Sequence, residues 1–452
     1  MSDVMVTLFM MAFLALGLRK PFVWVLAYLY VDIVQPQNIT YHFLNALPLS
    51  LIVFVLAVGG WVAVDRGQAR GLSVRQGLMV ALLVYCGIST QMAVFPSAAA
   101  AKWDWVWKAL VFAIFMPFTL GTRLRLEAAA LVMVLAVGSI LIEGALKTLT
   151  GGGGYDMLRL FLDTNTGIYE GSTISACAIA IIPLILWLAK YGTIFPPDKR
   201  VRLFALGLVG AALLMPIGTA ARTGLVCMVV LGGLKLLSVK RRGLYLAVIA
   251  VGVMVAVPLL PSSYSARMGT IQNNKSDESA QTRVAVWNWT LGYVAQHPFG
   301  GGFQVYLANK IKVVTSDSAS AGGVTTNQKG TTEDHARAFH SAYFEMLGEQ
   351  GWPGLILWLA LQISGLVQLQ QVRMKLRRSE DPLDARDAAM ATALQEGHVV
   401  YLVGALFVGI AFQPFVYMLI GLQIALAQQV GQRVRARGRA PVMVAGWQPL
   451  RV

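Results

Sequence analysis

The fold is decided by residues 173–189, TISACAIAIIPLILWLA, which carry no charged side chain. An apolar segment of this length crosses the roughly 30 Å hydrocarbon layer of a membrane as one helix, since a helix rises about 1.5 Å per residue. Comparable stretches recur along the chain at Val4–Leu18, Phe22–Val34, Leu47–Val64, Gln76–Met92, Val106–Leu120, Ala128–Leu146, Leu203–Pro216, Gly224–Leu237, Leu244–Leu260, Gly354–Leu369 and Tyr401–Val430. The sequence therefore predicts an all-α integral membrane protein with about twelve transmembrane helices.

The composition agrees with this interpretation. Of the 452 residues, 56% are hydrophobic and 13% are charged, whereas a soluble globular domain has roughly 25% charged residues. The N-terminus carries no basic residue before its first apolar run, and Arg19 and Lys20 follow that run. We therefore expect the first span to stay in the membrane and not to be a cleaved signal peptide.

The net charge of +15 predicts orientation in the membrane and not nucleic-acid binding, because the basic residues gather in short loops. These clusters are Arg66/Arg70/Arg75, Arg123/Arg125, Lys199/Arg200/Arg202, Lys240/Arg241/Arg242, Arg373/Lys375/Arg377/Arg378 and Arg433/Arg435/Arg437/Arg439. By the positive-inside rule they are cytoplasmic. The alternate loops, at 93–103, 148–171, 218–222 and 261–352, are then expected in the periplasm of a Gram-negative host, with the protein in the inner membrane.

The basic residues at the two ends of the chain are also cytoplasmic if one condition is met at each end. The basic C-tail requires 398–430 to be a hairpin broken at Gln413–Pro414, and Arg19 with Lys20 requires the first two apolar runs to form a short pair. The predicted domains are N-terminal transmembrane helices (1–260), a long periplasmic loop with the catalytic residues (261–352), and C-terminal transmembrane helices with a basic cytoplasmic tail (353–452).

The long loop is predicted to carry short helices. Residues 282–295 place Val284, Trp287, Leu291 and Val294 at helical spacing and stop at His297-Pro298, which is typical of an interfacial amphipathic helix. Residues 341–350 form a second short helix, ended by Gly351-Trp352-Pro353-Gly354. The stretch 315–334 between them is rich in Ser, Thr, Gly and Asn, so we expect a mobile connection that acts as a lid.

Three residues are candidates for chemistry. His340 precedes the second short helix, whose N-terminus disfavours imidazolium, so the neutral ring can accept the proton of a sugar hydroxyl; the alternative is a histidine that caps this helix. Arg222 lies where a turn of small residues meets a span, within reach of a phosphate, or else it snorkels to lipid headgroups. Arg283 begins the amphipathic helix and suits a pyrophosphate, or else it is a solvated charge.

The residues favour a reaction without a metal or other cofactor. No Asp-x-Asp pair occurs, and the acidic residues near a membrane opening are expected to be scattered. Glu333, Asp334 and His335 can be drawn together with His340 as a metal site, but they fall in the polar stretch that we expect to be mobile. The cysteines Cys86, Cys177 and Cys227 all lie in apolar stretches and are odd in number, which predicts packing and neither disulfides nor zinc.

Four motifs together resemble those of the O-antigen ligase superfamily. They are GTAARTGLV at 218–226, QTRVAVWNW at 281–289, HPFGGGF at 297–303 and FHSAYFEMLGEQGWPGL at 339–355. This superfamily also holds O-antigen polymerases and protein O-oligosaccharyltransferases. The wording FHSAYFEMLGE looks most like the ligases found beside exosortase-type polysaccharide systems.

The resemblance implies a fold related to the GT-C-type membrane glycosyltransferases. It also implies that Arg222 and Arg283 bind the carrier pyrophosphate and that His340 is the general base. The ligases transfer O-antigen from undecaprenyl pyrophosphate to the lipid A–core oligosaccharide, with inversion and without metal or nucleotide. The expected partners are this donor, this acceptor and membrane lipids, with no nucleic acid.

Other functions remain open at this point. A polymerase joins two lipid-linked repeats, and an oligosaccharyltransferase modifies a protein, and the sequence does not separate these from a ligase. A transporter of polyprenyl-linked glycans would have a similar number of spans. However, a transporter should show internal repeats and ionisable residues within its spans, whereas here the polar residues cluster on one loop.

Overall fold

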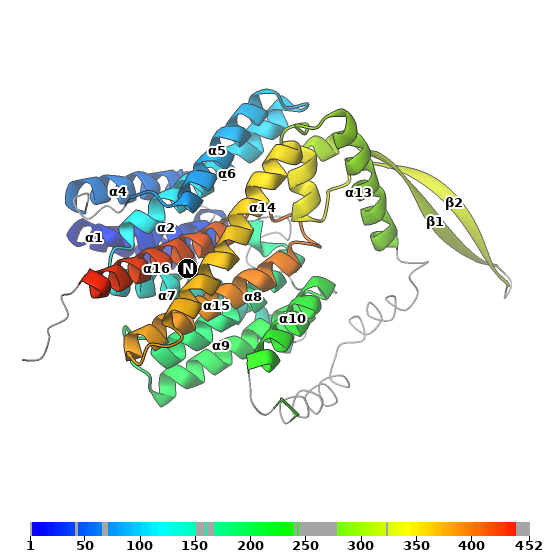
Figure 1. Ribbon diagram of the computed structural model, residues 1–452. Helices are drawn as coiled ribbons and strands as arrows, with labels where there is room; N and C mark the ends of the chain where they lie inside the picture. The colour runs from blue at the N-terminus through cyan, green and yellow to red at the C-terminus, as the bar shows by residue number, and fades with distance from the viewer. Residues whose placement is uncertain are drawn as a thin grey trace, which may run out of the picture.

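The computed structural model describes residues 2–40, 44–65, 71–150, 158, 160, 167–238, 242–243, 278–321 and 324–439. Most of these residues are helical (Figure 1). The N-terminal helices are α1 (Ser2–Arg19), α2 (Phe22–Val34), α3 (Pro36–Ile39), α4 (Leu49–Val64), α5 (Val74–Gln91), α6 (Pro96–Thr119) and α7 (Arg123–Leu149). They are followed by η3 (Gly167–Tyr169), α8 (Gly171–Tyr191), α9 (Lys199–Gly218), α10 (Arg222–Ser238), α13 (Glu278–Gln296), η6 (Val305–Ala308), α14 (Ala342–Leu376), α15 (Pro382–Gly404) and α16 (Pro414–Arg439).

The helices are those of a multi-pass membrane protein. Within the described residues, five helices are long and apolar enough to cross a membrane, namely α7, α8, α9, α14 and α16. The helices α2 and α4 are apolar but shorter. The expected span Leu244–Leu260 lies outside the described residues, and the count of about twelve stays a prediction.

Helix α8 lies at the centre of the bundle and is buried along most of its length. It packs against α7, α9, α10 and α15. The crossing with α15 is close because Gly397 has no side chain, since a Cβ there would come within 2.4 Å of the Ala180 carbonyl oxygen. Small residues at helix interfaces allow this kind of backbone approach in membranes.

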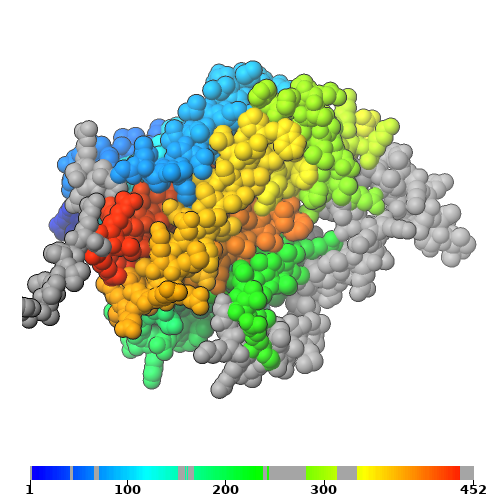
Figure 2. Space-filling model, in the orientation of Figure 1, coloured from blue at the N-terminus to red at the C-terminus, as the bar shows by residue number. Residues whose placement is uncertain are grey.

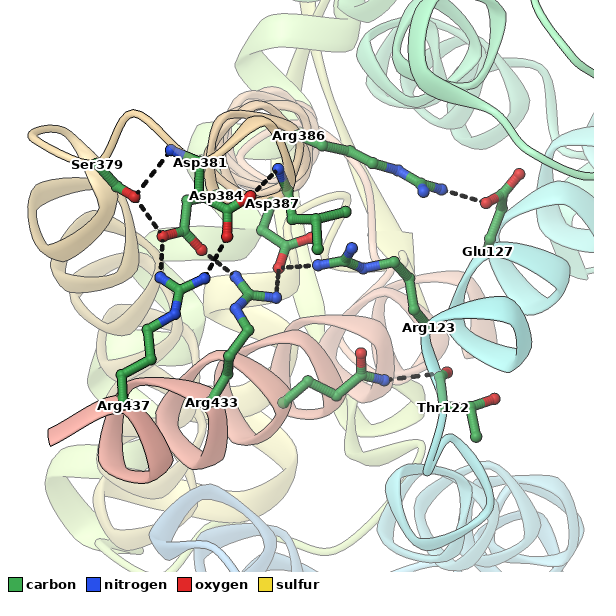
Figure 3. A network of polar contacts seen from close by, with 12 residues as sticks. Thr122, Arg123, Glu127, Ser379, Asp381, Asp384, Arg386, Asp387, Arg433 and Arg437 are labelled. Carbon is green, nitrogen blue, oxygen red and sulfur yellow. Dashed lines mark hydrogen bonds and ion pairs between the residues drawn. The ribbon is translucent and has the colours of Figure 1, made fainter. Parts of the chain in front are cut away.

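A network of ion pairs joins α7, α15 and α16 at one end of the bundle (Figure 3). Asp384 and Asp387 of α15 form ion pairs with Arg433 of α16. Asp387 also forms an ion pair with Arg123 of α7 at 2.7 Å. Arg437 reaches Asp384 at 2.5 Å. Several of the basic residues that were expected only to set the orientation therefore also hold three helices together.

In the N-terminal half, one predicted loop is mostly helical and one predicted helix pair is present. The loop expected at 93–103 is wrong for most of its length because α6 begins at Pro96, and proline suits the first turn of a helix. At the N-terminus, α1 and α2 are the expected short pair, joined by Lys20 and Pro21 and packed against each other.

The C-terminal hairpin has the predicted break but a longer first arm. Helix α16 begins at Pro414, directly after the non-helical residues 405–413. Helix α15 already begins at Pro382 and not near residue 398, because its acidic and basic side chains are paired with other helices and do not end the helix.

The stretch 315–334, which was expected to be a mobile connection, forms most of a β-hairpin that was not predicted, and its role as a lid stays a prediction. Strand β1 (Lys310–Ala321) pairs antiparallel with β2 (Val324–His335), with Lys310 opposite His335. The hairpin projects away from the helices (Figure 1). Its Val and Thr residues favour strands because they are β-branched, a signal that the Ser, Gly and Asn content concealed.

Both short helices of the long loop are present. Helix α13 covers the expected 282–295 and ends before His297. Helix α14 begins at Ala342, is interrupted at Gly351 (φ 63°, ψ −167°), and continues as a long helix. Figure 2 shows the face on which α13 lies beside the first part of α14.

Candidate functional site

A pocket of about 420 Å³ lies where α6, the start of α8, the loop before α14 and the 405–413 segment meet. Its lining includes His340, the charged residues Lys102, Glu170, Glu345 and Glu349, the amides Gln304 and Gln413, and the aromatic residues Trp105, Tyr306, Phe339 and Phe412. This volume lies within the range of about 300–1,000 Å³ for small-molecule sites. Of the three predicted residues, only His340 lines the pocket.

His340 is held in an unusual backbone conformation, with φ 47°. Residues other than glycine rarely adopt this left-handed backbone conformation. Such backbone strain often occurs at functional sites. The N-cap of α14 is Ser341, whose carbonyl accepts the Glu345 amide at 2.8 Å. His340 is therefore not the N-cap of this helix, and the capping interpretation is wrong.

The environment of His340 favours the neutral imidazole. Desolvation by the surrounding protein lowers the pKa of His340, the charges of Arg283 and Arg337 lower it further, and Glu170 opposes them. The ordinary histidine pKa is about 6.5. Near pH 7 the ring can consequently accept a proton.

Helix α13 fixes the backbone next to His340. The indole Nε1 of Trp287 donates to the Phe339 carbonyl at 2.9 Å, and the Trp287 ring stacks on Phe344 with ring centroids 4.8 Å apart. On the other side, the Ala342 amide donates to the Ala405 carbonyl at 2.8 Å. Contacts from α13 and from the 405–413 segment thus hold the His340 loop.

The apolar residues of α13 divide between the protein interior and the surface. Val286, Thr290 and Val294 are fully buried, whereas Val284 and Leu291 are 52% and 46% exposed. The buried residues pack toward β1 and α14. Exposed apolar residues such as Val284 and Leu291 are compatible with the predicted interfacial amphipathic helix.

The glycine motifs join α13 to α14 through their backbones. The amides of Gly301 and Gly302 donate to the carbonyls of Gly348 and Glu349 at 3.0 and 2.9 Å. A Cβ on Gly300 would come within 2.5 Å of the Gly351 nitrogen, and both glycines have positive φ. Only glycine allows this approach, which gives the HPFGGGF and GEQG sequences a physical role in placing His340.

A buried charge cluster beside His340 was not predicted from the sequence. Lys102 Nζ donates to Glu345 Oε1 at 2.6 Å and to Glu349 Oε2 at 2.7 Å, and all three side chains are nearly inaccessible. The ammonium also lies 5.4 and 5.7 Å from the ring centroids of Phe303 and Phe412. The acidic residues here are therefore not scattered as expected. The available signal was the i, i+4 spacing of the two glutamates on the helix that follows His340.

The structure places the two candidate arginines outside the pocket lining. Arg283 lies in the second turn of α13, and its charge acts on His340. Arg222 is the first residue of α10, after a turn in which Ala220 has φ 48°. In that turn Thr219 Oγ1 lies 2.8 Å from Ser175 Oγ of α8, so Arg222 starts its helix beside the end of α8 that lines the pocket.

One of the suggested metal ligands, Asp334, has other partners. Asp334 pairs with Arg337 and accepts the His335 amide at 3.0 Å. Among the described residues, no group of three or more His, Cys, Asp or Glu side chains is arranged to hold a metal ion.

Two protein families match this chain. Residues 207–359 match a family described as O-Antigen ligase, and residues 1–193 match a family of unknown function (DUF5935). A comparison with curated proteins found no match. The first match contains Arg222, Arg283 and His340 as well as the two glutamates of the charge cluster, whereas Lys102 falls in the second.

Proposed function

Because the chain belongs to the O-antigen ligase superfamily, we propose that it transfers a glycan from undecaprenyl pyrophosphate to the lipid A–core oligosaccharide of lipopolysaccharide. The observation that carries this proposal is the position of His340, which lines a pocket large enough for a sugar and whose pKa is lowered by desolvation and by nearby arginines. The inner membrane and the periplasmic face are part of the same proposal, and the positions of the basic clusters support them.

The reaction follows from the roles of three residues. A hydroxyl of the acceptor attacks the anomeric carbon of the donor and gives its proton to His340. The bond between that carbon and the pyrophosphate oxygen breaks, and undecaprenyl pyrophosphate leaves with the electron pair. Attack from the face opposite the leaving group inverts the anomeric centre. Arg222 and Arg283 stabilise the leaving pyrophosphate, because a guanidinium binds phosphate oxygens in a bidentate manner.

A polymerase or a protein O-oligosaccharyltransferase would use the same donor and the same base with a different acceptor. Deletion of the gene in its host separates the three functions. We expect rough lipopolysaccharide with polymer retained on the carrier. Single repeats in place of polymer would indicate a polymerase, and intact lipopolysaccharide with unglycosylated protein would indicate an oligosaccharyltransferase.

A further inference from the structure

The charge of the pocket beside His340 is negative. Its lining contains three carboxylates, Glu170, Glu345 and Glu349, and one ammonium, Lys102. Lys102 is already held by Glu345 and Glu349 at 2.6 and 2.7 Å. Glu170 accepts from the amide and the hydroxyl of Thr173 at 2.6 and 2.7 Å, and no cation of the described chain lies within ion-pair distance of it. A pyrophosphate placed here would meet like charge, which is costly in a partly buried site.

Gln413 indicates what kind of ligand the pocket takes. Its side chain is 8% exposed and lines the pocket, and in the described part of the chain its amide group has no hydrogen-bond partner. The amide atoms are not fully shielded, so they are accessible from the pocket and can bond to a ligand there. Its two N–H groups and its oxygen match the donors and acceptors of sugar hydroxyls.

The remaining lining is aromatic. Trp105, Tyr306 and Phe412 surround the polar groups, a combination of apolar walls with a few placed polar groups that is typical of small-molecule sites. Such walls suit the apolar faces of a sugar ring. His340 lies on the same lining, so a sugar in the pocket can present a hydroxyl to it.

We propose that this pocket is the acceptor subsite and that its negative charge selects an acceptor sugar that carries no phosphate. The donor pyrophosphate is then excluded from the pocket and stays on the side of Arg222 and Arg283, so the two substrates approach His340 from different directions. Glu170 and Gln413 become specificity-determining residues for the acceptor. This inference rests on the proposed function, since it requires a glycosyl acceptor.

The test uses the full-length protein in lipid nanodiscs with a lipid-linked glycan donor. The acceptor is lipid A–core oligosaccharide in two forms, one with a neutral terminal sugar and one with a phosphate on that sugar. Wild type should use the neutral form and discriminate against the phosphorylated one. Glu170→Gln keeps an oxygen for the Thr173 contacts and should reduce this discrimination. Asp104→Asn is the control, because it removes an exposed carboxylate next to Trp105 that does not line the pocket, and it should leave the discrimination unchanged.

Gln413→Ala is the second arm. It should raise the KM for the neutral acceptor about three- to tenfold, as expected for the loss of a neutral hydrogen bond, and leave the KM for the donor unchanged. Gln371→Ala, at an exposed position far along α14, serves as its control and should change neither value.

The outcomes separate the two proposals. The acceptor subsite would be overturned if Gln413→Ala formed product with an unchanged acceptor KM and Glu170→Gln kept the wild-type discrimination. The transfer reaction itself would then still stand. A change in donor KM alone would assign the pocket to the donor and also overturn the inference. Absence of product in the wild type with any acceptor would instead contradict the proposed function.

Discussion

His340 is placed so that loss of its ring should stop chemistry without stopping donor binding. We expect His340→Ala to reduce transfer by about 10²- to 10⁴-fold, the usual contribution of a general base. The donor should still bind, because the proposed pyrophosphate contacts come from the arginines. Binding and transfer are measured separately with purified protein and lipid-linked donor. His335→Ala, at an exposed position on β2, is the control. Retained transfer in His340→Ala, or loss of donor binding, would show that His340 is not the base.

The pH dependence follows from the lowered pKa of His340. Only the neutral ring accepts a proton, so transfer should be constant near pH 7 and should fall as the pH drops through a value below about 6.5. Arg283 and Arg337 lower this pKa and Glu170 raises it, while Lys102, Glu345 and Glu349 share the pocket. Glu170→Gln should therefore move the acid limb of the kcat profile to lower pH. A limb that moves to higher pH, or a profile without an acid limb, would contradict the assignment.

Arg222 and Arg283 should tolerate lysine poorly. Lysine retains the charge but lacks the planar fork that binds two phosphate oxygens. We expect Arg222→Lys and Arg283→Lys to impair transfer strongly at normal abundance in the membrane. Arg377→Lys, in an exposed basic loop, should behave as wild type. If both lysine variants transfer normally, the two arginines are structural charges.

At the level of single residues, the sequence indicated candidates that lie within short motifs. His340 and Arg283 stand next to recognisable glycine, tryptophan and proline positions. Lys102 could not be connected with Glu345 and Glu349, because the contact joins residues more than two hundred positions apart. Gln413 was seen only as a helix break, since nothing in its local sequence shows that its amide is buried in a pocket.

At the level of elements, the Lys102 cluster ties α6 to the helix that follows His340. Removal of one partner from a buried ion pair leaves an uncompensated charge and costs about 3–5 kcal/mol. We therefore expect Lys102→Met to lower the thermal unfolding temperature strongly in detergent. Lys108→Met, which breaks an exposed pair with Asp104 on the same helix, should change stability by about 0–1 kcal/mol.

A compensating variant checks the cause of this effect. The triple substitution Lys102→Met, Glu345→Gln and Glu349→Gln removes the orphaned carboxylates and should recover part of the lost stability. If Lys102→Met unfolds at the wild-type temperature, the cluster does not hold α6 to α14.

Elements were predictable where one physical signal dominated. Long apolar runs gave the helices of the bundle, and Gly351 and Pro414 gave their breaks. The β1–β2 hairpin was missed because composition suggested a loop, although its threonines and valines favour strands. The start of α15 was missed because only the apolar run from Tyr401 was taken as a span, whereas the helix begins at Pro382 and its Asp387 and Arg386 pair with arginine and glutamate on α7.

At the scale of the whole molecule, the predicted sidedness can be tested with single cysteines. The native Cys86, Cys177 and Cys227 are all buried, so they should give little background with an impermeant thiol reagent. Lys310→Cys, at an exposed position where β1 begins, should react from the periplasmic side. Glu380→Cys, exposed between α14 and α15, should react only after the membrane is opened. The reverse pattern would invert the topology.

The ion-pair network of α7, α15 and α16 also has a consequence for the order of biosynthesis. Arg123 enters the membrane early, Asp384 and Asp387 follow much later, and Arg433 and Arg437 arrive after both. Until α16 has been made, the aspartates of α15 have at most Arg123 to neutralise them. A chain cut between α15 and α16 would leave surplus negative charge at the predicted cytoplasmic surface. The arginines of α16 therefore complete the ion pairs of α15, and we expect a chain that ends before α16 to be less stable than the full-length protein.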